Sequence, residues 1–402
     1  MRVLYLSPSG ELGGAERALL ENISALRSQE PSWTIGLIAL EDGPALSEAR
    51  SLGIDVTVLP PPPLFAATGE SGHAPSTTLL RLTRSAAPLV GYARTLRREV
   101  AAWRPDVVHS NGIKTHVLGA WAKASASLVW HVHDYLSTRH ISAPLLRHHR
   151  RSVAAVIANS NSVAADVRRV LGDHVRTATI YNAVDPERFT PEGPRMDLDA
   201  AAGLPHAAPG TLRIGLVGTF ARWKGHEVFL RALAGMPDRH SFRAYVVGGP
   251  VYRTGDASQV TIAELRAIVR ETGLDGLVGF TGFVARPAEA YRALDVVVHA
   301  STEPEPFGLA IAEAMACGRP VILSEAGGAM EIGESERTCL THLPGDVGRL
   351  TRQIARLLHD APLRERLAGA GAAFVRERFT RARLAQSLGH LYHDLTNASC
   401  QA

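Results

Sequence analysis

Short apolar segments of strand length alternate with amphipathic helical patterns along the whole chain, and this alternation is the strongest restriction on its fold. In the first half the expected strands lie at 3–7, 34–40, 54–59, 107–109, 128–132 and 153–158. In the second half they lie at 212–217, 242–247, 277–284, 296–299 and 321–323. Strands separated by helices need crossover connections, which favour parallel sheets with helices on both faces. The sequence therefore predicts an α/β fold of doubly wound parallel sheets.

The length of 402 residues allows two such sheets, each in a domain of its own. We expect the first domain at 1–185 and the second at 211–380. The segment 186–210 between them contains five prolines and three glycines, a composition typical of an interdomain linker. Helical patterns continue to the end of the chain, where 381–402 is expected to form a final helix.

The composition is that of a globular protein that does not span a membrane. It is 46% hydrophobic and 20% charged, with no run of eighteen or more apolar residues. The N-terminus begins with the strand-like run Arg2–Ser7 instead of a signal peptide, so we expect a cytoplasmic protein. Cys317, Cys339 and Cys400 are too few and too scattered for a disulfide framework or a zinc site. We interpret all three as reduced, structural residues.

One stretch, 303–323, combines a rigid loop, a helix and a strand in an order that favours anion binding. Two prolines keep the loop out of a helical conformation, and Gly308 permits a tight turn before the Ala-rich helix at 309–317. The backbone N–H groups of Phe307, Gly308 and Leu309 then lie at the positive end of a helix dipole. Such a position binds phosphate readily.

Two carboxylates flank this anion site. Glu305 lies in the loop, and Glu313 lies about a turn and a half into the helix, so they would contact opposite ends of a bound molecule. Because carboxylates accept hydrogen bonds from hydroxyl groups, the pattern fits a ligand with hydroxyls at both ends and phosphate between them, as in a nucleotide sugar. The same pair could serve as acid and base of a glycoside hydrolase, although the helical position of Glu313 argues against that role.

Two other loops have the composition of phosphate-binding turns. Gly13 and Gly14 follow the first strand, but their spacing is not Gly-x-Gly-x-x-Gly, and a simple tight turn explains them equally well. The first strand of the second domain is followed by Gly218 and then by Arg222 and Lys224. Two cations in one loop suit a diphosphate, whose charge they offset. Each of them alone is equally compatible with a solvated surface side chain.

Polar residues also end two expected strands of the first domain. Asn111 follows one of them, and His131, His133 and Asp134 end the next. Alternation along the strand puts the two histidines on the same face. Open α/β sheets bind ligands at the carboxyl ends of their strands. A histidine at a strand end is also commonly a hydrogen-bonded structural residue, so the residues alone leave both interpretations open.

Positive charge is concentrated in part of the first domain. Between Leu79 and Arg151 there are twelve Lys and Arg residues against three Asp and Glu residues, a net charge of +9, while the whole chain has +4. This region could hold the protein against anionic lipid or attract an anionic acceptor, or its arginines could simply cover solvated helix faces. The absence of interleaved aromatic residues argues against nucleic acid. The Pro-rich segment 60–76 is interpreted as a flexible flap near the acceptor.

Together these motifs are similar to the signature of family 4 glycosyltransferases, retaining enzymes with the GT-B fold. The similarity extends over nearly the whole chain, through Gly13-Gly14-Ala15-Glu16, Asp106-Val-Val-His-Ser-Asn111, His131-Val-His133-Asp134, Ala158-Asn-Ser160, Tyr181-Asn-Ala-Val-Asp185, Trp223-Lys224-Gly225 and the 303–323 stretch. The resemblance implies two Rossmann-like domains facing across a cleft, with the donor held mainly by the second domain and the acceptor by the first. It also implies that the final helix returns to the first domain.

The resemblance implies a role for each matching residue. The catalytic set is Glu305, His133, Lys224 and Arg222. The donor-binding set is Gly13, Gly14, Gly218, Arg222, Lys224, Val284, Glu305, Phe307, Gly308, Leu309 and Glu313, with Glu305 on the sugar and Glu313 on the ribose. The acceptor side is Asn111, Lys114 and Asp134. Many family members carry an arginine where this chain has Thr219, so Arg222 is expected to supply that charge.

The expected function is retaining transfer of a hexosyl unit from a UDP- or GDP-sugar to a glycan, a lipid-linked or a small-molecule acceptor. The implied chemistry is front-face substitution, in which the donor phosphate takes the acceptor proton, and neither a metal nor another cofactor is expected. Peripheral contact with the anionic inner face of a membrane is an expected partnership, and nucleic acid is not. The alternatives are a nucleotide-sugar hydrolase or epimerase of the same fold, and a non-enzymatic nucleotide-sugar-binding subunit.

Overall fold

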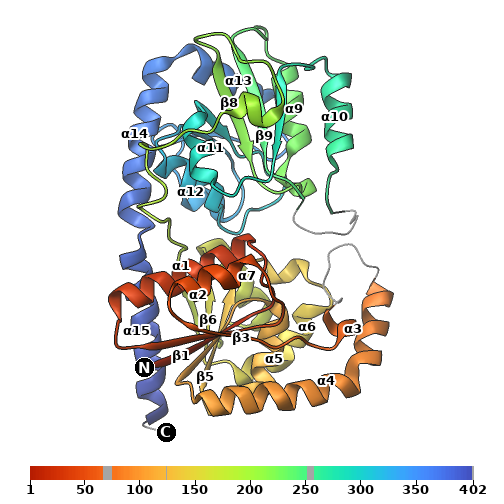
Figure 1. Ribbon diagram of the computed structural model, residues 1–402, viewed down its shortest axis with the longest axis vertical. Helices are drawn as coiled ribbons and strands as arrows, with labels where there is room; N and C mark the ends of the chain where they lie inside the picture. Colours follow the sequence, from red (N-terminus) through yellow and green to blue (C-terminus); the bar gives the residue numbers. More distant parts are fainter. Residues whose placement is uncertain (67–74, 124, 251–257, 401–402) are drawn as a thin grey trace. The chain divides into compact units, whose positions relative to one another are not determined.

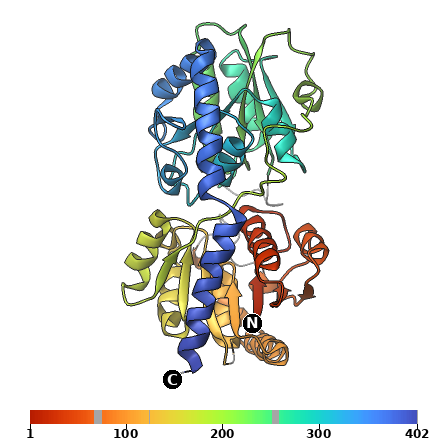
Figure 2. The same cartoon turned by 90° about the vertical axis from the view of Figure 1, so that its left-hand side faces the viewer.

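The structure is a computed structural model that describes residues 1–66, 75–123, 125–250 and 258–400. It divides into two compact units (Figures 1 and 2). Unit 1 consists of Met1–Ala183 and Arg381–Ala402, and unit 2 of Val184–Thr380. Each unit has one parallel sheet covered by helices, which confirms the doubly wound α/β fold predicted from the alternating pattern.

Unit 1 contains a seven-stranded sheet in the order β3-β2-β1-β4-β5-β6-β7, with all neighbours parallel. The strands are β1 (Arg2–Ser7), β2 (Thr34–Ala39), β3 (Asp55–Val58), β4 (Val107–Ser110), β5 (Ser127–Val132), β6 (Ala155–Ala158) and β7 (Thr177–Thr179). In the register, Val3 of β1 lies opposite Ile35 on one side and Val107 on the other. The sequence did not predict β7, because its three half-buried residues lie at the sheet edge and carry little apolar pattern.

Helices cover both faces of this sheet. One face is packed by α1 (Gly14–Gln29), α2 (Pro44–Ser51) and α15 (Arg381–Cys400), and the other by α4 (Pro75–Trp103), α5 (Ile113–Ala122), α6 (Ser142–His149) and α7 (Asn161–Leu171). The short helices α3 (Pro63–Ala66), η1 (Leu136–Thr138) and η2 (Arg150–Ser152) lie in loops. Val3 and Tyr5 of β1 pack into the first core, while Leu4 and Leu6 pack into the second. Burial on both faces explains why β1 is a continuous apolar run.

The last helix, α15, packs along α1 in unit 1 (Figure 1). Its first residue, Arg381, forms an ion pair with Glu21 of α1 at 2.7 Å. Its buried residues Leu388 and Tyr392 belong to the same core as Val3 and Tyr5 of β1. The C-terminal helix is therefore a structural part of the first unit, although it follows the second unit in the sequence.

Unit 2 contains a six-stranded parallel sheet in the order β10-β9-β8-β11-β12-β13. The strands are β8 (Leu212–Val217), β9 (Phe242–Val247), β10 (Val278–Gly282), β11 (Val296–Val298), β12 (Val321–Ser324) and β13 (Leu340–His342). The helices are α8 (Leu198–Ala202), η3 (Arg222–Lys224), α9 (His226–Ala234), α10 (Ile262–Glu271), α11 (Pro287–Ala293), α12 (Leu309–Ala316), η4 (Gly328–Glu331), α13 (Val347–His359) and α14 (Ala361–Arg378). The sequence did not predict β13, because Thr341 and His342 are polar residues at buried positions.

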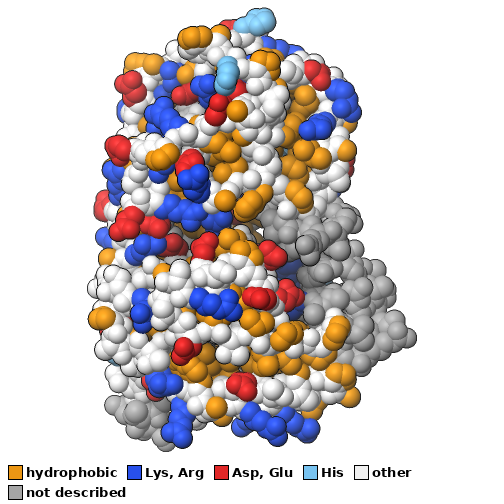
Figure 3. Space-filling view, in the orientation of Figure 1, with side chains coloured by type: hydrophobic (Ala, Val, Ile, Leu, Met, Phe, Trp, Pro, Cys, Tyr) orange, Lys and Arg blue, Asp and Glu red, His pale blue; other side chains and the backbone are white. Residues whose placement is uncertain are grey.

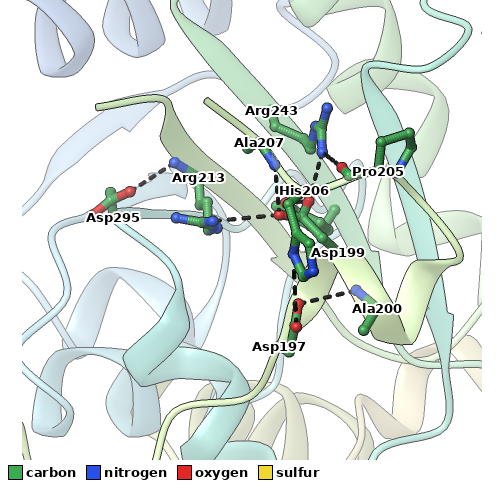
Figure 4. A network of polar contacts seen from close by, with 10 residues as sticks. Asp197, Asp199, Ala200, Pro205, His206, Ala207, Arg213, Arg243 and Asp295 are labelled. Carbon is green, nitrogen blue, oxygen red and sulfur yellow. Dashed lines mark hydrogen bonds and ion pairs between the residues drawn. The ribbon is translucent and has the colours of Figure 1, made fainter. Parts of the chain in front are cut away.

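The segment 186–210, expected to be a linker, is a packed part of unit 2. It contains α8, whose Asp199, labelled in Figure 4, is buried. Asp199 accepts a hydrogen bond from Tyr245 Oη at 2.6 Å. The same carboxylate forms ion pairs with Arg243 at 2.7 Å and Arg213 at 3.4 Å. Burial by itself raises the pKa of Asp199, but these hydrogen bonds and charges hold it well below its usual value. The prolines and glycines of this segment shape turns around a packed helix.

Arg292 of α11 holds the start of the same segment. Its buried guanidinium donates hydrogen bonds to the backbone carbonyl oxygens of Arg188, Thr190 and Pro194, at 2.8, 2.9 and 3.0 Å. Because the planar guanidinium group binds three carbonyl oxygens at once, it fixes the path of the backbone. Both ends of the segment 186–210 are therefore anchored to unit 2.

Several other expectations concern the surface and the thiols. Arg94, Arg97 and Arg98 are exposed on α4, where basic side chains are visible along the edge of unit 1 (Figure 3). Part of the expected flap, 67–74, lies outside the described residues. None of the helices described is both long and apolar enough to cross a membrane. Cys317 and Cys339 are buried free thiols, and burial raises the pKa of each to about 12.

Candidate functional site

The carboxyl ends of β8 and β11 lie side by side at the point where the strand order of unit 2 reverses. From β8 the chain continues to β9 on one side of the sheet, and from β11 it continues to β12 on the other. Open α/β sheets bind ligands at such switch points. The loops that leave these two strands, 218–225 and 299–308, contain most of the donor residues predicted in unit 2.

Lys224 and Glu305 bring these two loops into contact. Nζ of Lys224 lies 2.6 Å from Oε2 of Glu305, and the side chains are only 20% and 8% exposed. Nζ also lies 4.0 Å from the centroid of the Trp223 ring. Burial alone raises the pKa of Glu305, but the charge of Lys224 and a hydrogen bond from His299 bring it down to about 2. Glu305 is therefore an ionised carboxylate at neutral pH, held beside a cation.

Further contacts hold Glu305 from the side of the sheet. Its Oε2 lies 3.1 Å from Nε2 of His299 and 3.3 Å from Oγ of Ser301. Its backbone is also fixed, because its carbonyl oxygen accepts from the N–H of Gly328 at 2.7 Å and its own N–H donates to the carbonyl of Ala326 at 3.3 Å. The direction of this carboxylate is thus set by its surroundings.

Glycines allow the backbone to approach closely at the switch point. Gly225 ends the η3 turn with φ 72°, and a Cβ atom there would collide with the carbonyl oxygen of Ala300. A Cβ atom at Gly248, φ 131°, would collide with the carbonyl oxygen of Gly218. Gly218 itself has open space where its Cβ would lie. Gly225 and Gly248 therefore accept no side chain, so the loops pack backbone against backbone there.

The N-terminus of α12 follows Glu305 directly. Its N-cap, Gly308, has φ 101° in the left-handed region. The N–H groups of Gly308, Leu309 and Ala310 donate no hydrogen bond to any residue in the described part of the chain. They mark the positive end of the helix dipole, three residues beyond Glu305 in the sequence, and the expected binding of a phosphate there stays a prediction.

Of the remaining predicted residues near α12 and β10, Phe307 and Glu313 have structural contacts within unit 2. Phe307 is buried and packs edge-on against Phe379, with ring centroids 5.4 Å apart, which holds the loop before α12. Glu313 accepts a hydrogen bond from Tyr291 Oη at 3.1 Å, so its side chain is oriented from α11. Val284 is half-buried in the loop after β10. Their predicted contacts with donor, ribose and base stay predictions.

Arg222 lies in the same turn as Lys224 but has another partner. Its guanidinium forms an ion pair with Glu264 of α10 at 2.6 Å, and both side chains are exposed. Glu264 in turn caps α10 by accepting from the N–H of Thr261 at 2.6 Å. Arg222 therefore supplies a cation to α10 in this structure, and its expected role in place of an arginine at Thr219 stays a prediction.

In unit 1 the strand order reverses between β1 and β4. Asn111, directly after β4, links the loop after β1 to the end of β5. Its Nδ2 donates to the carbonyl oxygen of Ala15 at 3.0 Å, and its Oδ1 lies 2.7 Å from Nε2 of His133. Since Oδ1 is an acceptor, Nε2 of His133 carries the proton of that pair. The structure thus joins Asn111 and His133 to the turn that begins at Gly13 and Gly14.

The turn itself is closed by Glu16. Gly13 is the N-cap of α1, and a Cβ atom there would lie 2.6 Å from Oε2 of Glu16. Burial raises the pKa of Glu16 to about 7, although hydrogen bonds from the backbone N–H groups of Glu16 and Gly13 lower it. Gly14 has open space at its Cβ position. The missing side chain at Gly13 therefore makes space for the Glu16 carboxylate. The missing side chain at Gly14 leaves open space beside the loop.

A chain of rings leads from the half-buried His133, through the buried His131 and His109, to the C-terminal helix. The rings of His133 and His131 share one face, as strand alternation predicts, with centroids 4.1 Å apart. Nδ1 of His131 lies 3.2 Å from Nε2 of His109, whose Nδ1 lies 2.5 Å from Tyr392 Oη. Burial lowers the pKa of His109 to about 3, that of His133 to about 4 and that of His131 well below its usual value. All three imidazoles are therefore neutral at pH 7.

The predicted acceptor residues lie at the same edge of the sheet in unit 1. Asp134, after β5, forms an exposed ion pair with Arg139 at 2.9 Å. Lys114 lies in the first turn of α5, which begins after Gly112. Asn111 is buried and already engaged by Ala15 and His133. Their contact with an acceptor stays a prediction.

Asp197, Asp199 and His206 form a cluster that could be considered for a metal ion. Among the described residues it is the one group of acidic and histidine side chains whose ligand atoms lie close enough together. It lies on α8, its N-cap and the following loop (Figure 4). Asp199 pairs with Arg213 near the start of β8, whereas the switch point lies at the carboxyl end of that strand. Asp199 is already bound by Tyr245 and by two guanidinium groups, which would repel a cation. This chemistry favours a structural role.

The sequence interpretation missed the residues that orient the two predicted carboxylates. His299 and Ser301 were a detectable signal, because alternate residues on an extended chain share a face and these two follow β11 directly, just before Glu305. Tyr291 gave no such signal, since nothing in the sequence links α11 to Glu313. Glu16 is part of the motif Gly13-Gly14-Ala15-Glu16, but the burial of its carboxyl group depends on the fold of the turn.

Comparison with known families decides the class of this protein. Residues 12–188 match the family described as Glycosyltransferase Family 4, and residues 211–360 match the one described as Glycosyl transferases group 1. The chain belongs to the family 4 glycosyltransferases. The matched ranges correspond closely to the two units, and the family resemblance drawn from the motifs is confirmed.

Related sequences with curated names are glycosyltransferases. D-inositol 3-phosphate glycosyltransferase 2 of Catenulispora acidiphila is 35% identical over 227 residues, which cover 54% of this chain and 50% of that protein. The D-inositol 3-phosphate glycosyltransferase of Stackebrandtia nassauensis is 29% identical over 416 residues, covering 96% of this chain and 88% of that protein. The matched region of this family 4 chain thus spans about half the length of the first relative and most of the second.

Solved structures confirm the GT-B fold of this family 4 glycosyltransferase. Anabaena HepE, in complex with UDP and glucose, superimposes with a TM-score of 0.80 at 27% identity, covering 97% of this chain and 99% of HepE. HepE in complex with UDP-glucose gives the same TM-score and identity over 98% of this chain and 100% of that one. Sucrose-phosphate synthase from Thermosynechococcus elongatus has the same fold, with a TM-score of 0.78 at 23% identity over 99% of this chain and 100% of that one.

Proposed function

We propose that the protein transfers a hexosyl unit, with retention, from a UDP- or GDP-sugar to a glycan, a lipid-linked or a small-molecule acceptor. The contact between Lys224 and Glu305 carries this proposal, because it joins a cation suited to a diphosphate with a carboxylate suited to sugar hydroxyls at one switch point. The N-terminus of α12 adds N–H donors beside them. The likeness to HepE, solved with UDP-glucose, makes UDP-glucose the first donor to test.

Most of the predicted residues have a part in this proposal. Glu305 accepts hydrogen bonds from the sugar, and Glu313, held by Tyr291, accepts them from the ribose. Lys224 and the first amides of α12 contact the diphosphate, and Arg222 joins them by leaving Glu264. In unit 1 the proposed donor contacts are His133 and the turn at Gly13 and Gly14, and the proposed acceptor contacts are Asn111, Lys114 and Asp134.

The proposed reaction is front-face substitution. The bond between the anomeric carbon and the diphosphate oxygen breaks, and the acceptor hydroxyl oxygen bonds to the same face of that carbon. The leaving phosphate oxygen takes the hydroxyl proton. Lys224 and the N-terminal amides of α12 stabilise the negative charge that develops on the diphosphate. The reaction so written needs no protein nucleophile, and these groups supply the electrostatic work that a metal performs in other enzymes.

The test of the donor is thermal stabilisation by a panel of UDP-, GDP-, ADP- and TDP-sugars. A ligand that binds the folded state at a hundredfold excess over its Kd stabilises it by about 2.7 kcal/mol. We expect one nucleotide series to raise the Tm, Glu313→Ala to weaken that shift, and Glu365→Ala, on the exposed surface of α14, to leave it unchanged. A protein whose Tm responds to none of the four series does not have the proposed function.

The rival functions differ in what happens to the bound donor. A nucleotide-sugar hydrolase releases free sugar as fast without an acceptor as with one. An epimerase converts one nucleotide sugar into another without releasing the nucleotide. A binding subunit shows the Tm shift and no turnover. Product analysis of the bound donor with and without a panel of sugar acceptors therefore separates all three from a transferase.

An anionic membrane is the proposed surface partner. From 135 to 165 the chain has no acidic residue, while Arg147 and Arg151 are exposed together with the apolar Ile141 and Leu145. Basic and apolar side chains on one short segment favour binding at the surface of anionic lipid. Sedimentation with phosphatidylserine vesicles should show binding that is lost at high salt, and phosphatidylcholine vesicles should not bind. Equal absence of binding to both at low salt would exclude this partner.

A further inference from the structure

Three donor groups converge on one oxygen atom of Glu305, and two of them have no part in the reaction described above. Oε2 lies 2.6 Å from Nζ of Lys224, 3.1 Å from Nε2 of His299 and 3.3 Å from Oγ of Ser301. Nε2 and Oγ are 2.8 Å from each other. His299 and Ser301 are both buried, so this pair contacts Glu305 from within the unit.

The orientation of the His299 ring follows from its other nitrogen. The backbone N–H of Ser324, at the end of β12, donates to Nδ1 of His299 at 3.3 Å. An N–H donor at Nδ1 requires a lone pair there, so the proton of the neutral ring is on Nε2. Nε2–H is then directed at Glu305 and Ser301, and the Ser301 hydroxyl can donate to Glu305. In this geometry both residues are donors toward the carboxylate.

The backbone of the pair is fixed by the sheet. The N–H of His299 donates to the carbonyl oxygen of Ile322 at 2.8 Å. The carbonyl oxygen of Ser301 accepts from Oγ of Ser324 at 2.6 Å. Nε2 of His342, on β13, lies 3.2 Å from the carbonyl oxygen of His299. Because β12 and β13 hold the pair, its position does not depend on the partner of Lys224.

In the proposed function, Lys224 can pair with either of two anions, the Glu305 carboxylate or the donor diphosphate. A donor diphosphate carries more negative charge than one carboxylate and competes with Glu305 for the same ammonium group. Glu305 is 6% exposed, and a buried carboxylate that loses its cation is strongly destabilised unless other donors remain. In the described part of the chain, His299 and Ser301 are donors that remain in contact with this carboxylate.

We propose that His299 and Ser301 are positioning residues for glycosyl transfer, which keep Glu305 ionised and directed at the donor sugar while the diphosphate takes up Lys224. The inference rests on the proposed function, since it needs a diphosphate ligand. Among the described residues, the charged and titratable groups that face Glu305 include Lys224 from η3 and His299, which follows β11, with His342 of β13 behind His299.

Two substitutions of His299 form the first test. His299→Leu removes the donor at similar volume, and His299→Gln keeps an N–H near the position of Nε2. We expect kcat/KM for the nucleotide sugar to fall about 10- to 100-fold in the first variant and to recover largely in the second. Affinity for the free nucleoside diphosphate, which has no sugar for Glu305 to hold, should stay within about twofold. Thr338→Ala, which removes a buried hydroxyl bonded to the N–H of Glu334, is the matched control.

The second readout is the titration of the Glu305 carboxyl group, followed by 13C NMR in the ligand-free protein. A hydrogen bond to the charged form lowers a pKa, so His299→Leu must raise the pKa of Glu305 and His299→Gln must raise it less. Ser301→Ala gives the same measurements if His299→Leu does not fold.

The outcomes separate this inference from the proposed function. Variants that leave both kcat/KM and the Glu305 pKa unchanged, in an enzyme that still transfers sugar, overturn the positioning role. If His299→Leu abolishes binding of the free nucleoside diphosphate as well as of the nucleotide sugar, His299 is needed for folding, and the positioning role is overturned as well. A wild-type protein that binds no nucleotide sugar overturns the proposed function itself.

Discussion

The ammonium group of Lys224 lies 2.6 Å from the carboxylate of Glu305, although the two residues are 81 positions apart in the chain. Lys224 follows β8 and Glu305 follows β11, and these strands are neighbours in the sheet of unit 2. The ion pair therefore links the two loops that flank the switch point. Since both side chains are largely removed from solvent, each charge depends on the other.

Removing one member of this pair should cost more than removing both. Lys224→Met leaves the buried Glu305 without its cation, and we expect a loss of about 3 kcal/mol in the free energy of unfolding of unit 2. The double variant Lys224→Met/Glu305→Gln should recover much of that loss, because the uncompensated charge is gone. Guanidinium unfolding of the wild type, both single variants and the double variant measures this. Strictly additive effects would show that the two residues are not coupled.

Gly225 should be far less tolerant of substitution than another glycine with the same backbone conformation. Gly203 has φ 66° and open space at its Cβ position, so Gly203→Ala should cost about 1 kcal/mol for backbone strain alone. Gly225→Ala adds a collision with the backbone of Ala300 and should at least double that loss and displace Lys224. Unfolding free energies of the two variants decide this, and equal values would contradict it.

Asp199 should be essential to unit 2, while its neighbour Asp197 should not. Asp199→Ala leaves Arg243, Arg213 and Tyr245 without their buried acceptor and should cost about 3–5 kcal/mol. Asp197→Ala removes the N-cap of α8, which accepts from the N–H of Ala200, and should cost about 1 kcal/mol. Hydrogen exchange should locate the loss in Val184–Thr380. A free-energy change at Asp199 as small as that at Asp197 would be incompatible with the network in Figure 4.

Unit 1 should lose stability when the pH falls below about 6.5, the ordinary histidine pKa. Burial lowers the pKa of four of its histidines, so the unfolded chain binds protons at a pH where the folded unit does not; they are His109, His116, His131 and His133. The contribution of these histidines is therefore full above pH 6.5 and falls toward pH 4, by up to about 1.4 kcal/mol per pH unit for each histidine. Glu16, whose pKa burial raises to about 7, has the opposite dependence and offsets about one of the four histidines over part of this range.

Urea unfolding at a series of pH values, followed by hydrogen exchange in unit 1, measures this slope. His131→Leu should flatten it, because one group that must stay neutral is removed. Substitution of the exposed His148 should leave it unchanged. A free energy of unfolding that does not vary between pH 7 and pH 5 would show that these histidines titrate normally.

Most strands and the positions of the predicted site loops could be derived from the sequence. Strands buried on both faces, such as β1 and β8, are continuous apolar runs that end in glycine or polar residues, so both the strand and the loop after it are visible. The short strands β7 and β13 were missed, because their neighbours in the sheet, rather than their own apolar residues, hold them in place.

The partners of the site residues could not be derived in the same way. Arg222 and Lys224 stand two positions apart and look equivalent, but only the fold shows that one pairs with Glu264 and the other with Glu305. The segment 186–210 was misjudged for a related reason. Its prolines and glycines suggest a free connection, whereas the buried contacts of Asp199 with β8 and β9 depend on residues that come later in the chain.

The position of α15 has a consequence for co-translational folding. Leu388, Tyr392 and their neighbours complete the core behind β1 and α1, but they are synthesised only after the whole of Val184–Thr380. During translation, the apolar faces of β1 and α1 that α15 later covers stay exposed while unit 2 is synthesised and folds. The unit that is made first is therefore the one that can finish folding last, and it is the half that a chaperone would have to shield.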